Sequence, residues 1–208
     1  MPSISTHVNF ARIAVPKLAL PYHIFCFILG TIAPDCFERS DDESFRIYHF
    51  VRDDCDSDLD YFLEMICPLG RGNDILQLSY TVGYYAHLWL DNFVRANEGT
   101  LLIAHPDYWP QDELRALVKA NVERYNLRAM AEFLRGIEPM AFTPIPKFEF
   151  VSHETVMQSW RQLLSSCHEA REQSEQVVLI EENQYTQFLL NAVDHFISAF
   201  PAILGLAA

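Results

Sequence analysis

Hydrophobic residues recur at helical spacing over almost the whole chain, and this pattern limits the fold more than any other feature. Apolar side chains follow one another three and four positions apart, as at Leu59, Phe62 and Ile66, which is the spacing of one buried helix face. The alternating β-branched runs that are typical of sheets do not occur at hairpin spacing. The pattern predicts an all-α protein in which residues 1–208 form a single multi-helix domain.

Capping residues, glycines and prolines divide this pattern into segments. A first helix through Ala14 is closed by Pro16, and Pro21 opens an apolar helix that we expect Gly30 to end. Residues 31–55 are predicted to form a loop. Further helices are expected at 56–66, 73–95, 111–134, 152–175 and 183–201, with loops at 99–110 and 136–150.

Acidic residues outnumber basic ones by a wide margin, and the formal net charge is −13. Such a surface repels phosphate backbones and anionic membranes, which disfavours nucleic acid as a partner. An anionic substrate would need a local source of positive charge, for which a metal ion is the obvious candidate. The longest apolar stretch, residues 18–33, contains Pro21 and His23 and is shorter than the roughly 20 residues that span a bilayer. No transmembrane segment is therefore predicted.

The start of the chain and the cysteines both bear on the compartment. The first residues lack the basic and apolar regions of a secretory signal. The 5 cysteines are odd in number, irregularly spaced and without a CxxC pair, which is typical of a reducing environment. We expect a cytoplasmic protein.

His87 and Asp91 lie four positions apart in a buried helical stretch. This spacing places both side chains on one helix face, where an imidazole and a carboxylate can share a metal ion. Taken alone, the pair is better explained by a buried hydrogen bond, either between the two side chains or from His87 to another backbone. His7, Asp35 and His49 also have ordinary interpretations, as a capping, a turn and a half-buried residue respectively. Only their order along the chain, together with their sequence context, raises the case for a metal centre.

Four segments, taken in order, resemble the zinc-dependent phospholipase C family, whose fold is shared by the S1/P1-type nucleases. The resemblance covers residues 5–95, and its most specific parts are the Gly-x-Ile-Ala-Pro-Asp stretch and the His-x-x-x-Asp helix. It implies a helical fold of the phospholipase C/P1 nuclease type and a zinc-dependent phosphoric ester hydrolase. The four segments are Thr6-His7 with Phe10-Ala11, Leu29 to Asp35, His49-Phe50, and Tyr85 to Asp91.

The resemblance also implies roles for five residues. His7 would bind one metal ion, Asp35, His49 and His87 would bind a second, and Asp91 would bridge the two. Asp35 would in addition orient the attacking water as the catalytic carboxylate. Imidazole and carboxylate ligands suit one or two zinc ions, and manganese, iron and nickel accept the same donors.

Two features of the family have no clear counterpart in this sequence. Secreted members use the amino group of the mature chain as a ligand, whereas no signal is seen here. The family's third metal site begins with a histidine shortly after the bridging aspartate, and none follows Asp91. His168 and Glu172 have the spacing of its remaining pair, and His105 or His153 could complete it. A solvated helix face explains that pair more simply, so we expect the third ion to be absent.

Arg95, one turn beyond Asp91, and Tyr84, just before His87, are candidates for contact with a substrate. A surface ion pair and core packing are their structural alternatives. The sequence thus predicts a metal-dependent phosphoesterase that hydrolyses a phosphodiester, either a phospholipid head group or a small soluble ester. The alternative is a non-catalytic helical protein whose structural or vestigial metal site serves a ligand-binding or interaction module.

Overall fold

The computed structural model describes residues 2–18, 21–36, 42–52, 56–66, 74–97, 111–140, 151–169 and 180–203, apart from the side chains of residue 42, 111–115 and 201–203. Within these ranges the regular elements are helices and no strand occurs, so the all-α prediction is confirmed. The elements are α1 (Ile4–Ala14), η1 (Val15–Lys17), α2 (Ile24–Ile32), η2 (Ala33–Asp35), α3 (Asp42–Tyr48), α4 (Leu59–Ile66), α5 (Ile75–Asn97), α6 (Gln111–Arg135), α7 (His153–Glu169) and α8 (Glu182–Ile203).

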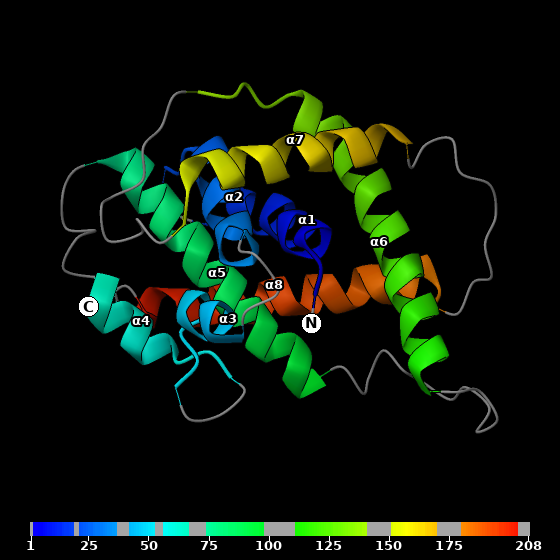
Figure 1. The fold of residues 1–208 in the computed structure, drawn as a ribbon, viewed down its shortest axis with the longest axis horizontal. Coiled ribbons are helices and arrows are strands. Elements are labelled where there is room, and N and C mark those ends of the chain that lie inside the picture. Colours follow the sequence, from blue (N-terminus) through cyan, green and yellow to red (C-terminus); the bar gives the residue numbers. More distant parts are fainter. Residues whose placement is uncertain are drawn as a thin grey trace.

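The two N-terminal helices occupy the middle of the structure and the later helices surround them. Helices α1 and α2 lie between α7 on one side and α8 on the other, and α6 closes one end (Figure 1). Helix α5 packs along α2, and this is the most extensive contact between two elements. The short helices α3 and α4 lie on the side of α5. The N-terminal half therefore supplies the centre and the C-terminal half supplies cover.

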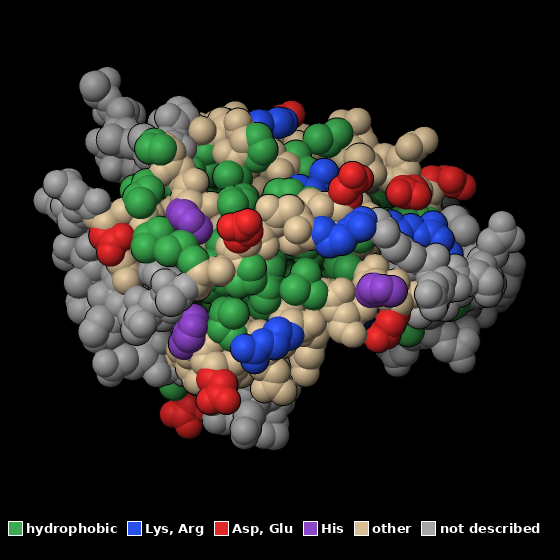
Figure 2. All heavy atoms as spheres, turned by 90° about the horizontal axis from the view of Figure 1, so that it is seen from above, with side chains coloured by type: hydrophobic (Ala, Val, Ile, Leu, Met, Phe, Trp, Pro, Cys, Tyr) green, Lys and Arg blue, Asp and Glu red, His purple; other side chains and the backbone are tan. Residues whose placement is uncertain are grey.

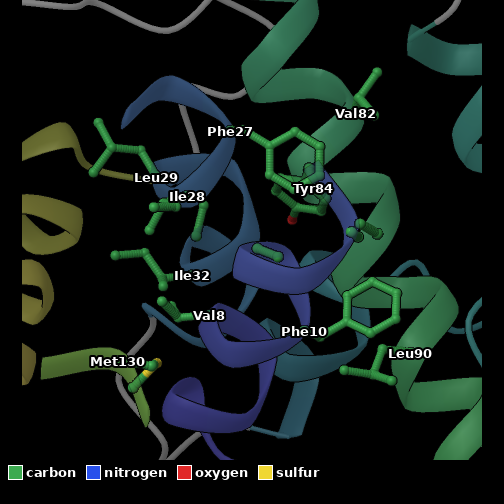
Figure 3. Packing of buried hydrophobic residues seen from close by; sticks show 14 of the residues in the cluster. Val8, Phe10, Phe27, Ile28, Leu29, Ile32, Val82, Tyr84, Leu90 and Met130 are labelled. Carbon is green, nitrogen blue, oxygen red and sulfur yellow. The ribbon is translucent and has the colours of Figure 1, made fainter. Parts of the chain in front are cut away.

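One hydrophobic cluster joins these helices. Helix α1 sends Val8 towards α2 and Phe10 towards α5, where Phe10 lies beside Leu90 (Figure 3). Both side chains are fully buried, and burial of a large apolar side chain contributes about 1.5–3 kcal/mol to stability. Helix α1 is thus buried on more than one side and connects the two parts of the core.

Helices α2 and α5 cross at unusually short range through two glycines. A Cβ atom on Gly30 would lie 2.0 Å from the carbonyl oxygen of Tyr80, and one on Gly83 would lie 2.0 Å from that of Phe27. Real Cβ atoms do not approach that closely, so only glycine fits at either position. The crossing fixes how α2 and α5 sit relative to each other.

Two of the predicted boundaries are wrong in this region. Gly30 does not end a helix, because α2 continues to Ile32 and a 3-10 turn extends it to Asp35. The glycine is explained by the helix crossing instead of by a C-terminal cap. The predicted loop 31–55 also contains helix α3, a segment whose polar start and short apolar stretch hide its helical period.

A buried polar network ties α1 to α6 and α8. The amide of Asn126, which is fully buried on α6, donates to the hydroxyl of Thr6 at 2.9 Å. Its oxygen accepts from the amide of Asn9 at 2.8 Å and from the hydroxyl of Tyr185 at 2.9 Å. Burying such groups is tolerated because each has a partner. Asn126 therefore fixes the orientation of the helix that carries His7.

The face seen from above shows hydrophobic side chains between interspersed acidic and basic ones, and the histidines visible there do not gather (Figure 2). Of the helices in the described ranges, none is long and apolar enough to cross a membrane.

Candidate metal centre

Five titratable side chains from four separate segments meet inside the protein. His7 comes from α1, Asp35 from the turn after α2, His49 from the end of α3, and His87 and Asp91 from α5. Each is between 0% and 6% exposed. The structure therefore brings together every residue that the sequence proposed for the two-ion site.

The carboxylate of Asp91 lies between the three imidazoles. Its Oδ1 is 3.3 Å from Nε2 of His7, while its Oδ2 is 3.6 Å from Nε2 of His49 and 3.5 Å from Nε2 of His87. The carboxylate of Asp35 also contacts this cluster, with its Oδ1 3.7 Å from Nε2 of His49. Asp91 thus presents one oxygen to each half of the cluster, as a bridging ligand would.

The tautomers of two histidines follow from their backbone partners. Nδ1 of His87 lies 2.8 Å from the carbonyl oxygen of Thr31, and Nδ1 of His49 lies 3.2 Å from that of Phe45. A carbonyl only accepts, so both Nδ1 atoms carry the proton. In the neutral rings the two Nε2 atoms then bear lone pairs, and these atoms are 3.3 Å apart. This arrangement is typical of metal-ligating histidines, whose other nitrogen is held by a backbone carbonyl.

The imidazoles stabilise both buried carboxylates in their charged form. Burial by itself raises the pKa of Asp91, but the nearby His87 and His7 outweigh it and hold that pKa well below its ordinary value. The pKa of Asp35 is also lowered, because contacts with His49, His87 and His7 exceed the effect of burial. The centre therefore holds two negative charges away from water.

The two stacked histidines respond in opposite directions. The rings of His7 and His87 lie 3.6 Å apart and nearly parallel. Burial and the adjacent His87 lower the pKa of His7. Burial also acts to lower the pKa of His87, but Asp91, Asp35 and the hydrogen bond to Thr31 raise it overall.

The geometry of this cluster could hold a divalent cation. Neither ring nitrogen of His7 has a hydrogen-bond partner in the described part of the chain, although both are buried. Two groups of three residues could each hold an ion, because within each group the ligand atoms lie within 4.8 Å of one another. The groups are His7, His87 and Asp91, and Asp35, His49 and His87. Uncompensated buried polar atoms are costly, and a cation held by either set would give the members of that set a partner.

Tyr84 and Arg95, the two residues proposed to contact a substrate, interact with other parts of the protein in the structure. The hydroxyl of the fully buried Tyr84 donates to the carbonyl oxygen of Tyr48 at 2.5 Å. The guanidinium of Arg95 pairs with Asp56 on the surface. Tyr84 therefore holds the backbone beside His49, and Arg95 forms the surface ion pair that was its structural alternative.

Of the residues proposed for a third metal site, the two that the structure describes do not come together. His153 begins α7 and His168 lies in its last turn, so about 22 Å of helix separates them and they cannot share an ion. His105 and Glu172 lie outside the described residues.

Two features that position the ligands are not visible in a sequence motif. The carbonyls of Thr31 and Phe45 act through the backbone, so their residue types carry no signal. Asn92 accepts from the backbone N–H of Ser57 at 2.9 Å and donates to its carbonyl at 2.8 Å. An asparagine directly after Asp91 was the available clue to this clamp.

Comparison of the chain with protein-family models, with curated proteins and with solved structures found no match.

Proposed function

We propose that this protein is a metal-dependent phosphoesterase of the zinc-dependent phospholipase C type. The observation that carries the proposal is the pair of Nε2 atoms on His49 and His87, 3.3 Å apart and flanked by Asp35 and Asp91. These imidazole nitrogens and carboxylate oxygens are donors that a divalent cation accepts, and a bound cation would neutralise the two buried negative charges. The order of the motifs along residues 5–95 supports the same assignment.

Five residues would hold the ions in two sets. Asp35, His49 and His87 form one set, His7 belongs to the other, and Asp91 presents an oxygen to each. Nitrogen and oxygen donors without a thiolate suit zinc, and also manganese, iron or nickel. When bound, a pair of such ions activates water and neutralises charge on a phosphoryl group.

The chain's own groups then have separate tasks. Asp35 is ionised because its pKa is lowered, so it can accept a hydrogen bond from the attacking water and orient it. Asp91 and the three imidazoles fix the place where a phosphoryl group is held. With a net charge of −13, the surface repels membranes and polynucleotides, which favours a small phosphodiester over a lipid in a bilayer.

A second candidate is a non-catalytic protein in which the metal staples four chain segments together. The burial of all five side chains, at 6% exposure or less, favours this alternative, because structural sites are closed whereas catalytic sites keep an open position.

Metal content and hydrolysis together decide between the two candidates. The protein is purified without chelator as wild type, His87→Ala and Asp91→Ala, with His168→Ala and Asp194→Ala as matched exposed controls. We expect about two equivalents of metal in the wild type and controls, and a loss in the two site variants. Hydrolysis of nitrophenyl phosphodiesters that a chelator abolishes supports the enzyme. Bound metal that stabilises the fold without hydrolysis supports the staple, and a metal-free wild type contradicts both.

A further inference from the structure

The end of helix α3 carries the one strained backbone position among the described residues. Phe50 has a φ of 54°, which is the left-handed region, and no other described non-glycine residue has a positive φ. It directly follows His49. Such outliers persist only where the surroundings hold them, and they cluster at functional sites.

The strain belongs to a helix-ending motif that normally uses glycine. The N–H of Phe50 donates to the carbonyl of Ile47 at 3.2 Å, and the N–H of Val51 donates to that of Arg46 at 2.9 Å. These two bonds define a Schellman cap, in which the left-handed residue is most often glycine because a Cβ atom is disfavoured there. Local structure alone would therefore place glycine at position 50.

The ring of Phe50 explains why a large residue is present instead. It is 9% exposed and its centroid lies 5.0 Å from that of Phe62, 5.9 Å from that of Tyr61 and 6.0 Å from that of Tyr84, with each pair tilted or edge-on. These geometries are favourable for aromatic contacts. The N–H of Asp58 also donates to the carbonyl of Phe50 at 3.0 Å. The cap is thus anchored to α4 and α5 through its side chain.

Two residues of α3 that precede this anchor, Phe45 and Tyr48, hold His49 in place. Its imidazole stacks on the ring of Phe45 at 4.1 Å and donates to the carbonyl of the same residue. The carbonyl of Tyr48 is bound by Tyr84, which also packs on Phe50. A rotation of the cap would move the imidazole of His49 away from His87 without unfolding α3.

We propose that Phe50 is a positioning residue for the metal centre, whose buried ring fixes the end of α3 and thereby aims Nε2 of His49 at His87. The proposal rests on the metal-binding function proposed above. It assigns to Phe50 no contact with metal or substrate. A ligand displaced by about 1 Å is enough to weaken a preorganised site strongly.

The test compares Phe50→Gly with Phe62→Leu. Glycine accepts the left-handed conformation but removes the anchor. The Phe62 substitution disturbs the same aromatic group from α4 and leaves the residues of the cap unchanged. Phe50→Leu keeps an apolar side chain and serves if the glycine variant does not fold. Each variant is titrated with cobalt(II), whose visible spectrum reports ligand geometry, and its melting temperature is measured.

We expect Phe50→Gly to bind one equivalent of cobalt about 10–100-fold more weakly, as for loss of a ligand-orienting group, with an altered spectrum. Phe62→Leu should lower the melting temperature while leaving cobalt affinity within about twofold. Unchanged cobalt binding in Phe50→Gly, or equal weakening in both variants, overturns the proposal.

A second readout does not depend on metal. The long-range nitrogen–proton NMR spectrum of the imidazoles shows the tautomer of His49, which is protonated at Nδ1 in the present arrangement. Phe50→Gly should shift the His49 ring signals and leave those of His7 in place. If the wild type binds no cobalt, the proposed function fails, and this spectrum alone decides the role of Phe50: unchanged His49 signals overturn it.

Discussion

Nδ1 of His87 donates a hydrogen bond to the backbone carbonyl of Thr31 across the closest crossing in the fold. Thr31 follows Gly30, and His87 lies one turn beyond Gly83, so each partner sits next to one of the two glycines that let the helices meet. The bond fixes the ring tautomer and leaves Nε2 facing the other ligands. The helix crossing and the chemistry of the centre therefore depend on the same backbone contact.

Gly83→Ala should damage both the fold and the centre. On an open helix this change stabilises by up to about 1 kcal/mol, but here the added Cβ meets the carbonyl of Phe27 at 2.0 Å. We expect a net loss of about 1–3 kcal/mol in the free energy of unfolding, and weaker metal binding as His87 moves off Thr31. Gly136→Ala is the control, since its Cβ would meet its nearest neighbour at an ordinary 3.5 Å. Equal denaturation midpoints for the two variants would contradict this account.

The two metal ions should bind with unequal affinity. Nδ1 of His87 is occupied by Thr31, so its single remaining lone pair can serve only one ion. We expect calorimetric titration of metal-free protein with zinc to show two steps at least tenfold apart, about 1.4 kcal/mol. His49→Ala should remove the tight step and His7→Ala the weak one. If both the His49→Ala and the His7→Ala variants still bound two equivalents of zinc in a single step, the division into a tight and a weak site would be wrong.

Proton release should distinguish the two steps. The pKa of His87 is raised above 6.5 and that of His7 is lowered below it, so at pH 6.5 the first ring is mostly protonated and the second mostly neutral. An ion that binds Nε2 of His87 must displace a proton, so the tight affinity rises with pH, by up to about tenfold per unit, until the raised pKa is passed. Titration in two buffers with different heats of ionisation counts the protons. If the proton were released on the weak step instead of the tight one, the assignment of His87 to the tight site would be wrong.

Asn126→Ala should destabilise the fold by about 2–4 kcal/mol. The change leaves buried groups of Thr6, Asn9 and Tyr185 without a partner, and each such loss is costly. Because the network orients α1, the zinc step that needs His7 should also weaken. Asn97→Ala is a matched control, as that amide donates to the carbonyl of Phe93 on its own helix. A thermal shift no larger than that of the control would show that the network contributes little.

Arg95→Ala should leave activity and stability nearly unchanged. Arg95 and Asp56 are 33% and 61% exposed, and exposed ion pairs contribute less than about 1 kcal/mol. Lys17→Ala, which removes a similar exposed pair with Asp194, gives the comparison. A selective fall in kcat/KM for Arg95→Ala, absent from the Lys17 variant, would restore the substrate contact predicted from the sequence.

Most of the helices and the His87–Asp91 pair were predictable because their signals are local. The expected helix 73–95 corresponds to α5 at Ile75–Asn97, and the four-residue spacing correctly placed His87 and Asp91 on one face. The motif order then brought in His7, Asp35 and His49, which no single local pattern identifies.

What could not be predicted depends on contacts between distant segments. Gly30 has the same local signal as a helix cap, and only the approach of α5 shows that it is a packing residue. Phe50 has no sequence signature of a left-handed cap, because its conformation is held by rings from α4 and α5. Arg95 follows Asp91 by one turn, yet a partner 39 positions away in the chain draws it to the surface.

The five central side chains all precede residue 92, in a chain of 208. During synthesis on the ribosome, every one of these groups is incorporated before helices α6, α7 and α8 are made. Helices α6, α7 and α8 therefore contribute none of the five central side chains. They pack onto a chain that already contains all of them.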